Sequence, residues 1–241
     1  MQRRRADLLL VERGLFESRA KAQAAIAAGL VTADDRPVTK ASAEIPVDAK
    51  LSAAPAHPYV SRGGVKLAAA LDHAAIEVTG RVCLDVGAST GGFTEVLLSR
   101  GARLVYAVDV GRDQLHPRLR GRPDVISLEG TDVRALDPAA LPEPPDLVVI
   151  DASFISLKLV VPAAMRLAAP RADLVALVKP QFELKRSDLK KGIVRDERLQ
   201  TAVCDDIAAF LAAQGCEVVA ILPSPIAGGD GNREFFVIAR R

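Results

Sequence analysis

The sequence predicts an α/β protein, with a mostly parallel, Rossmann-like sheet in a large C-terminal domain and a small α+β domain before it. From residue 62 onward, fully apolar runs alternate with stretches of helical spacing, a pattern typical of parallel strands covered by helices on both faces. The 241 residues leave room for one ordinary domain and one small domain. A hydrophobic content of 49% indicates a packed aliphatic core rather than a disordered chain.

The first predicted unit, residues 1–52, is compact and locally basic. The stretch "ADLLLVERGL" has the spacing of a short helix, and Ser18 is placed to cap a second helix over "RAKAQAAIAAG". The following "LVTADDRPVTKASAEI" predicts two short strands around a turn at Asp34-Asp35. Residues 53–61 contain two prolines and small side chains, so we expect a linker there and a second domain over residues 62–241.

Seven apolar runs predict the strands of the second domain, over residues 81–87, 103–110, 124–130, 145–153, 172–180, 216–225 and 233–240. Helices are predicted between them, among others over 92–100, 157–169 and 197–214. The last two runs have only a short connection, so we expect them to pair antiparallel at an edge of the sheet.

The net charge, the cysteine spacing and the N-terminal stretch exclude several classes of protein. The net charge is only +2, so any affinity for nucleic acid must come from local patches. Cys83, Cys204 and Cys216 lack CxxC spacing, which indicates buried free thiols rather than disulfides or a metal site. The N-terminal stretch lacks the long apolar region of a signal peptide, and no window approaches about 20 apolar residues. We expect a cytoplasmic, monomeric protein with no metal ion and no membrane contact.

A glycine-rich turn, "LDVGASTGGFT", follows the first apolar run of the second domain and opens a helix. In doubly wound sheets, ligands bind at such carboxyl strand ends. Gly87 would let the chain turn sharply, and Gly91 and Gly92 would allow a ligand to approach and the helix to pack. A P-loop is excluded because Gly-Lys-Ser/Thr is absent, which leaves a dinucleotide fold as the rival interpretation.

Three strand-end acids favour S-adenosylmethionine as the ligand of this turn. Asp85 would face a ligand ammonium but repel a pyrophosphate, Asp109 could accept hydrogen bonds from ribose hydroxyls, and Asp132 could reach an adenine amino group. The alternative is a bare turn with solvated acids. The acids and glycines predicted to bind the cofactor are Asp85, Gly87, Gly91, Gly92, Asp109 and Asp132.

Four further polar residues suit methyl transfer to a ribose 2′-hydroxyl. Lys66 stands at the entrance to a helix, whereas Asp151, Lys179 and Glu234 flank apolar runs at strand ends. A lysine made less basic by burial and a neighbouring cation could take the hydroxyl proton or orient the oxygen, and the acids would hold the lysines in place. The alternative interpretation is one ordinary surface ion pair and one pair at the edge of the core.

The chain resembles the TlyA (hemolysin A) family of ribosomal RNA 2′-O-methyltransferases, in which an S4-type RNA-binding domain precedes an FtsJ-like methyltransferase domain. The stretches that carry the resemblance cover nearly the whole chain: "GLFESRAKAQAAIAAGLV", "VSRGGVKL", "LDVGASTGGFTEVLL", "DLVVIDASFISL", "LVKPQFE" and "GNREFF". Of these, "DASFISL" and "LVKPQFE" are far more distinctive than the glycine turn.

The resemblance implies a catalytic tetrad of Lys66, Asp151, Lys179 and Glu234, and cytidine 2′-hydroxyls of ribosomal RNA as substrate. It implies that S-adenosyl-L-methionine binds around Asp85 to Phe93 and Asp109, which extends the predicted cofactor site to Ala88, Ser89, Thr90, Phe93, Val110 and Val133. It also implies that ribosomal subunits are the partners and that basic residues contact RNA phosphates. Because the sequence stops at "FFVIARR", it resembles the shorter members that act on the large subunit only. The predicted RNA contacts are Arg3, Arg4, Arg5, Ser18, Arg19, Lys21 and Arg62.

Several other functions compete with this one. A pore-forming haemolysin would need a segment that satisfies its backbone in lipid, and the apolar runs here are short and interrupted by charges. An RNA-binding assembly factor with an inactive methyltransferase domain is a further alternative, and an S4-bearing pseudouridine synthase would have no use for the cofactor turn. A methyltransferase acting on bases would usually carry a catalytic cysteine after proline, or an Asn/Asp-Pro-Pro-Tyr/Phe motif after the fourth strand, and the sequence has neither. The basic stretch 184–192 is either a loop that closes over RNA or a solvated loop.

Overall fold

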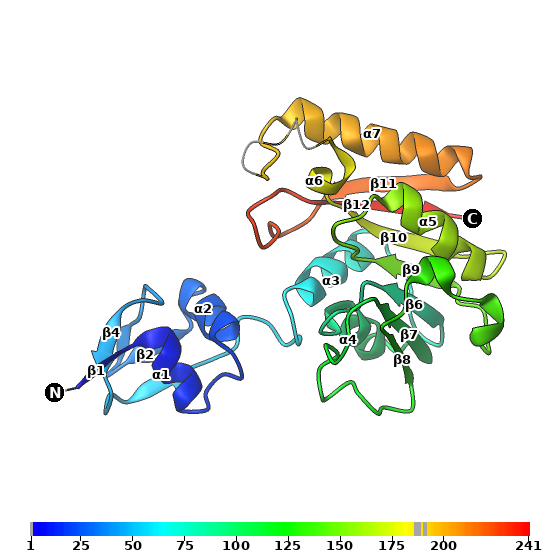
Figure 1. Ribbon diagram of the computed structural model, residues 1–241. Helices are drawn as coiled ribbons and strands as arrows, with labels where there is room; N and C mark the ends of the chain where they lie inside the picture. Colours follow the sequence, from blue (N-terminus) through cyan, green and yellow to red (C-terminus); the bar gives the residue numbers. More distant parts are fainter. Residues whose placement is uncertain (1, 186–188, 190–191) are drawn as a thin grey trace. The chain divides into compact units, whose positions relative to one another are not determined.

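The structure, a computed structural model, describes residues 2–185, 189 and 192–241. It divides into two compact units, Met1–Pro58 and Tyr59–Arg241 (Figure 1). Each unit has its own hydrophobic core, and each is described here by itself.

The first unit packs two short helices against two small antiparallel sheets. One sheet pairs β1 with β4, and the other has the order β3-β2-β5. The elements are β1 (Arg3–Arg5), α1 (Ala6–Glu12), α2 (Arg19–Ala27), β2 (Val31–Ala33), β3 (Arg36–Pro37), β4 (Glu44–Pro46) and β5 (Leu51–Ala53).

The predicted helix cap and turn of this unit are confirmed. The Ser18 side chain accepts a hydrogen bond from the backbone N–H of Lys21 at 3.4 Å, which caps α2. Asp34 and Asp35 both have positive φ, 50° and 61°, as a two-residue turn between β2 and β3 requires. Strands β1 and β5 were not predicted, and β5 extends one residue into the predicted linker.

The second unit is built on a seven-stranded sheet with the order β11-β12-β10-β9-β6-β7-β8. Every predicted apolar run forms one of these strands: β6 (Val82–Val86), β7 (Leu104–Asp109), β8 (Val125–Glu129), β9 (Leu147–Ile150), β10 (Asp173–Val178), β11 (Glu217–Pro223) and β12 (Phe235–Arg240). The last two pair antiparallel at one edge, as predicted. β12 lies one position in from that edge and runs against all the other strands, because it also pairs antiparallel with β10.

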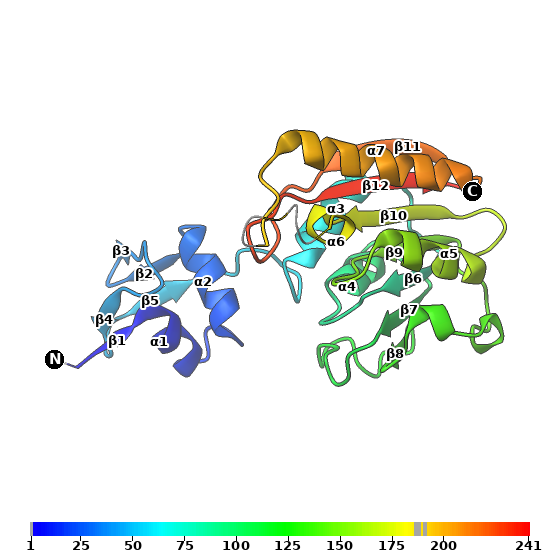
Figure 2. The ribbon, with the colours of Figure 1, turned by 45° about the horizontal axis from the view of Figure 1, so that its top comes forward.

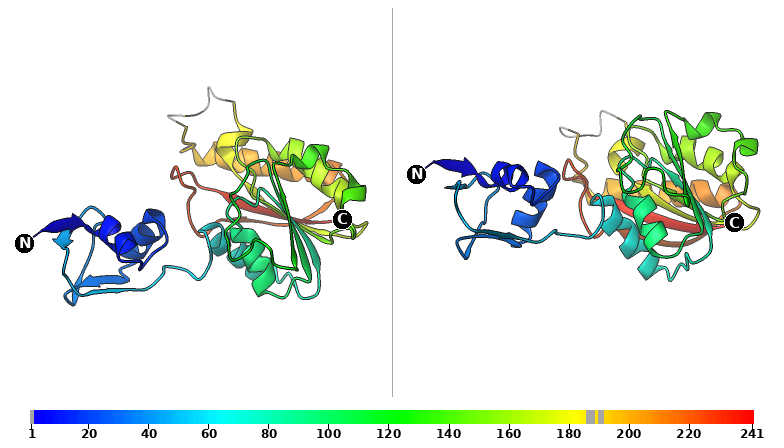
Figure 3. Two further views of the ribbon diagram at one scale, coloured as in Figure 1. Left: turned by 60° about the horizontal axis from the view of Figure 1, so that its bottom comes forward. Right: turned by 90° about the horizontal axis from the view of Figure 1, so that it is seen from below.

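Helices cover both faces of this sheet, as Figures 2 and 3 show. Helices α3 (Gly63–His73) and α4 (Gly92–Ser99) contribute to one core, and α5 (Leu157–Leu167) and α7 (Glu197–Ala213) contribute to the other. The remaining helical segments are short: α6 (Pro180–Glu183), η1 (Val133–Ala135) and η2 (Pro138–Ala140). Within the described ranges, no helix is long and apolar enough to cross a membrane.

The strand order places the functional loops at one edge of the sheet. β6 lies between β7 and β9, so the order in which strands are added to the sheet reverses at β6, where ligands bind in doubly wound folds. The loops after β6, β7, β8, β9 and β10 therefore all leave the sheet at the carboxyl ends of these parallel strands. Because β12 runs in the opposite direction, the residue that precedes it also lies at this end of the sheet.

Candidate active site

Three of the four predicted catalytic residues lie at neighbouring strand ends. Val178, the last residue of β10, pairs with Phe235, the first residue of β12, so Lys179 and Glu234 leave the sheet at the same point. Asp151 directly follows β9, the neighbour of β10 on its other side. Lys66 comes from the first turns of α3.

The four residues form two ion pairs. Lys179 Nζ lies 2.6 Å from Asp151 Oδ1 and also donates a hydrogen bond to Ser153 Oγ at 2.8 Å. Lys66 Nζ donates to Glu234 Oε2 at 2.5 Å. Both lysines are 8% exposed and Glu234 is 4% exposed, and charges this deeply buried persist only when they are paired. Each lysine thus lies against a carboxylate, rather than beside the neighbouring cation that we expected to make it less basic.

A cavity of about 240 Å³ brings the two ion pairs together. Lys66 from one pair and Asp151 from the other both line it. Its wall also includes Arg62 and much of the glycine-rich turn, namely Gly87, Ala88, Ser89, Thr90, Gly92 and Phe93. One predicted catalytic residue of each ion pair and much of the predicted cofactor turn therefore share one cavity, and Lys179 and Glu234 stand behind Asp151 and Lys66 as their ion-pair partners.

A second cavity of about 520 Å³ adjoins the first, because Gly87, Ser89 and Asp151 line both. Its size is within the range of small-molecule sites. Of the predicted cofactor residues that follow the glycine turn, all four line it, namely Asp109, Val110, Asp132 and Val133.

The larger cavity fits the chemistry of S-adenosylmethionine. Val110 is 72% exposed, which is unusual for an apolar side chain, and with Val133 it offers an apolar wall to an aromatic base. Asp109 accepts hydrogen bonds from the backbone N–H groups of Ser89 (2.8 Å) and Gly111 (2.7 Å), which fix its carboxylate at the cavity.

Asp132 is held at the same cavity by its neighbour Arg134. The backbone N–H of Arg134 donates to Asp132 at 2.9 Å, and its guanidinium forms an ion pair at 2.6 Å. These contacts hold the pKa of Asp132 below its ordinary value, so the group is an anionic acceptor for hydroxyl or amino donors.

The glycines of the turn are explained by contacts within the protein. A Cβ at Gly87 would lie 2.7 Å from the carbonyl oxygen of Asp151, and its φ is 83°. A Cβ at Gly91 would collide with Leu119, and one at Gly92 would collide with Ser61. We predicted close helix packing and close ligand approach, and the structure shows the packing. Gly91 lines neither cavity among the described residues.

Asp85 differs from its predicted place, because it lines neither cavity. Its side chain is fully buried beneath the turn, where Oδ2 accepts a hydrogen bond from Thr94 Oγ1 at 2.6 Å. Burial raises the pKa of this carboxyl to about 7. Phe93 also belongs partly to the core, since its ring stacks on Phe236 with centroids 6.2 Å apart.

The predicted RNA contacts of the small unit are largely engaged with acids. Arg5 and Arg19 both bind the fully buried Asp7, each at 3.0 Å, and Gln23 donates to the same carboxylate at 2.8 Å. The guanidinium of Arg5 is the main reason that the pKa of Asp7 lies well below its usual range.

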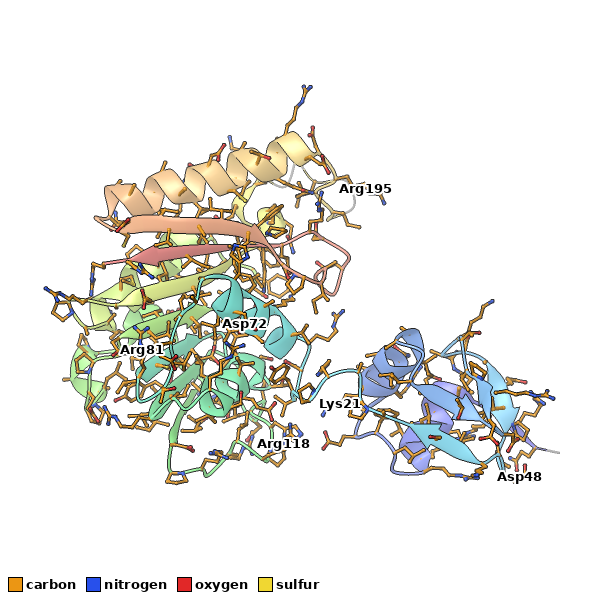
Figure 4. All side chains as sticks on the ribbon, turned by 180° about the vertical axis from the view of Figure 1, so that it is seen from behind. Lys21, Asp48, Asp72, Arg81, Arg118 and Arg195 are labelled. Carbon is orange, nitrogen blue, oxygen red and sulfur yellow. The ribbon has the colours of Figure 1, made fainter. Side chains whose placement is uncertain are left out.

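The other basic residues predicted to contact RNA in this unit also have partners. Arg4 pairs with Glu12, Lys21 on α2 pairs with Glu17, and Arg3 donates to the carbonyl oxygen of Glu44 (Figure 4). Ser18 is used as the helix cap, so its hydroxyl is engaged by the protein backbone. Arg62 lies in the second unit, at the smaller cavity.

The sequence analysis missed two aromatic residues beside the catalytic pair. Phe154 is 91% exposed, has a φ of 64° and lines the larger cavity. Its ring centroid lies 5.0 Å from that of Phe182, above which Lys179 Nζ stands at 6.0 Å. An apolar residue just after a strand-end acid, in "DASFISL", was the available signal.

Two further sequence predictions concern metal ions and the basic loop. Within the part of the chain that the structure describes, no group of three or more His, Cys, Asp or Glu side chains could hold a metal ion. The predicted loop 184–192 lies largely outside the described residues.

Two families match the chain. The sequence pattern described as "FtsJ-like methyltransferase" matches residues 59–241, and the "S4 domain" matches residues 4–50. The chain belongs to the FtsJ-like methyltransferase family. The match covers the whole second unit, including both cavities and all four predicted catalytic residues.

Individual relatives resemble the chain over nearly its full length. The "16S/23S rRNA (cytidine-2'-O)-methyltransferase TlyA" of Mycobacterium tuberculosis is 44% identical over 99% of this chain and 90% of its own. "Hemolysin A" of Brachyspira hyodysenteriae is 37% identical over 96% of this chain and 97% of its own. A solved structure named "Putative hemolysin", from Streptococcus thermophilus, has a TM-score of 0.79 and 40% identity over 100% of this chain and 89% of its own.

Proposed function

We propose that this protein transfers a methyl group from S-adenosyl-L-methionine to the 2′-hydroxyl of cytidines in ribosomal RNA. The observation that carries the proposal is the pair of adjoining cavities: one has the acids and apolar wall for the cofactor, and the other has Lys66 and Asp151. The name and full-length identity of the Mycobacterium relative support the substrate class.

The cofactor, when bound, supplies an electrophilic methyl group whose bond to sulfur breaks as the bond to the ribose oxygen forms. The chain must then remove the proton of a weakly acidic alcohol. We assign this step to the Lys179–Asp151 pair: Lys179 Nζ takes the hydroxyl proton as it passes one of its own protons to Asp151. Asp151 and Ser153 fix the position of that nitrogen, at 2.6 and 2.8 Å.

Lys66 lines the catalytic cavity and is held there by Glu234. A buried lysine held by one carboxylate keeps two N–H donors for other acceptors, so Lys66 is suited to orient the ribose hydroxyl or an adjacent phosphate. Arg62 lines the same cavity and supplies a guanidinium for the RNA backbone.

A target nucleotide must leave its helix to reach this cavity, and Phe154 is placed to receive its base. An exposed aromatic ring can stack on a base that has been turned out, at about 1–3 kcal/mol per base. The S4 domain would bind folded RNA through phosphates. We propose that it comprises residues 1–52, joined by 53–61 to the methyltransferase domain 62–241, and that the protein acts as a cytoplasmic monomer without a metal ion.

Methyl transfer from labelled S-adenosylmethionine tests the proposal. The substrates are small subunits, large subunits and intact ribosomes that lack the modification, and mass spectrometry maps the modified nucleotide. We expect 2′-O-methylcytidine with the wild type, no product with Lys179→Ala, and unchanged turnover with Lys158→Ala. Lys158 is a matched control because it pairs with Asp206 on α7, away from both cavities.

The same experiment separates the rival functions. Measurable cofactor binding without transfer to any substrate would favour an inactive RNA-binding factor. Equal lysis of erythrocytes by the wild type and Lys179→Ala, without methyl transfer, would favour the pore-forming activity suggested by the hemolysin names. Label in one subunit or in both decides which ribosomal RNA carries the target.

A further inference from the structure

Two catalytic loops are joined by contacts that the proposed chemistry does not use. The first loop follows β9 and runs from Asp151 to Ser156, and the second follows β10 and includes Lys179 and α6. At one end the loops meet through Lys179, which contacts Asp151 and Ser153. At the other end they meet through Glu183, the last residue of α6.

Glu183 uses both of its carboxylate oxygens on the first loop. Oε2 accepts a hydrogen bond from Ser156 Oγ at 2.5 Å, and Oε1 accepts one from the backbone N–H of Leu157 at 2.8 Å. Leu157 is the first residue of α5, so the carboxylate also lies at the positive end of that helix dipole. Glu183 lines neither of the two cavities.

Phe154 lies between the two points where the loops are joined. Its φ of 64° is unfavourable for a bulky residue and persists only where the surroundings fix it. Its contact with Phe182 fixes the ring, but the backbone on its C-terminal side is fixed by Ser156 and Leu157, through Glu183.

We propose that Glu183 is a positioning residue for methyl transfer: it holds the loop 151–156 against Lys179, so that Phe154 and the Lys179–Asp151 pair keep one relative placement. This inference rests on the proposed function for its catalytic consequence. Without the Glu183 contacts, the loop relaxes from its strained conformation. The Phe154 ring and the Lys179–Asp151 pair are then no longer placed to contact the base and the ribose of the same nucleotide. The cofactor acids Asp109 and Asp132 belong to other loops, whereas residues 151–155 also line the larger cavity, so we expect kcat at saturating cofactor to fall further than cofactor affinity.

Glu183→Gln is the test variant, because it keeps the size of the side chain but loses one acceptor oxygen and the charge. The matched control is Asp196→Asn, which makes the same chemical change at another helix cap, where Asp196 accepts from the backbone N–H of Arg198 at 2.9 Å. A third variant, Ser156→Ala, removes only the hydroxyl donor. For each, kcat, KM for ribosomal RNA, cofactor Kd, Tm and hydrogen exchange of the Leu157 amide are measured.

We expect Glu183→Gln to lower kcat at saturating cofactor by roughly 10- to 100-fold, as small misplacements of catalytic groups do. The Leu157 amide should exchange about tenfold faster, and adding Ser156→Ala should have little further effect. Asp196→Asn should leave kcat unchanged and change Tm little, because asparagine caps helices about as well as aspartate. A kcat of Glu183→Gln equal to that of Asp196→Asn would overturn the inference, as would unchanged Leu157 exchange. If neither the wild type nor Glu183→Gln transfers a methyl group, but the Leu157 amide exchanges faster in the variant, the proposed function is overturned. The role of Glu183 in holding the loop 151–156 is then still supported.

Discussion

Replacing Asp85 by Asn should stabilise the protein at neutral pH. The carboxyl is fully buried, Oδ2 accepts from Thr94, and Oδ1 has no hydrogen-bond partner among the described residues. Burial raises its pKa from 3.8 to about 7, and the negative charges of Asp151 and Asp109 act in the same direction. Asparagine has nearly the same shape and carries no charge to desolvate.

The pKa shift sets an upper bound on the gain. A rise from 3.8 to about 7 is about three units at 1.36 kcal/mol each, or about 4 kcal/mol. Between these values, the folded carboxyl keeps a proton that the unfolded one releases. The free energy of unfolding therefore falls as pH rises from about 4 to about 7, and above pH 7 the destabilisation by Asp85 is complete.

Urea unfolding between pH 4 and 8 measures the effect. We expect Asp85→Asn to be more stable than the wild type by about 2–4 kcal/mol at pH 8, with the gap closing toward pH 4. Asp124→Asn is the control of opposite sign, because Arg122 lowers the pKa of that surface carboxyl. Stability curves of wild type and Asp85→Asn that run parallel across this pH range would refute the reasoning.

Three further substitutions probe the proposed roles. Lys66→Met should abolish transfer and also lower the free energy of unfolding by about 3–5 kcal/mol, because it leaves buried Glu234 unpaired. In urea unfolding, the double variant Lys66→Met with Glu234→Gln should recover this stability, but it should not recover turnover. Phe154→Ala should lower kcat/KM for ribosomal RNA roughly 5- to 150-fold in assays at saturating cofactor. Arg19→Ala should weaken RNA binding in filter assays and reduce the slope of log affinity against log salt by about one.

The centre of the sheet was predictable because strands such as β6, β9 and β10 are buried on both faces. Runs such as "LVVI" in β9 and "DLVALV" in β10 carry almost no polar residues, and a strand covered on both sides has few other compositions. The polar residues that end these runs then indicate the functional edge. For the same reason Asp151 and Lys179 could be found without the structure.

Long-range pairings were not predictable from the residues alone. Lys66 and Glu234 are 168 positions apart, and nothing local to either one specifies the other as its partner. The burial of Asp85 was missed because a strand-end acid can point toward the ligand or beneath the turn, and the packing around Thr94 decides which. Asp7 reads as an ordinary first-turn acid, and only the fold brings Arg5 and Arg19 onto it.

The reversed direction of β12 explains why one residue of the catalytic set precedes a strand. In a parallel sheet, only residues that follow strands reach the carboxyl edge, and β9 and β10 supply Asp151 and Lys179 in this way. Running β12 against β10 brings Glu234 to the same edge beside Lys179. There Glu234 takes its cation from α3, so the second lysine is fixed by a helix that begins the domain. The active site thus draws four charges from four rigid elements and neutralises them in pairs, which makes their burial tolerable before any substrate arrives.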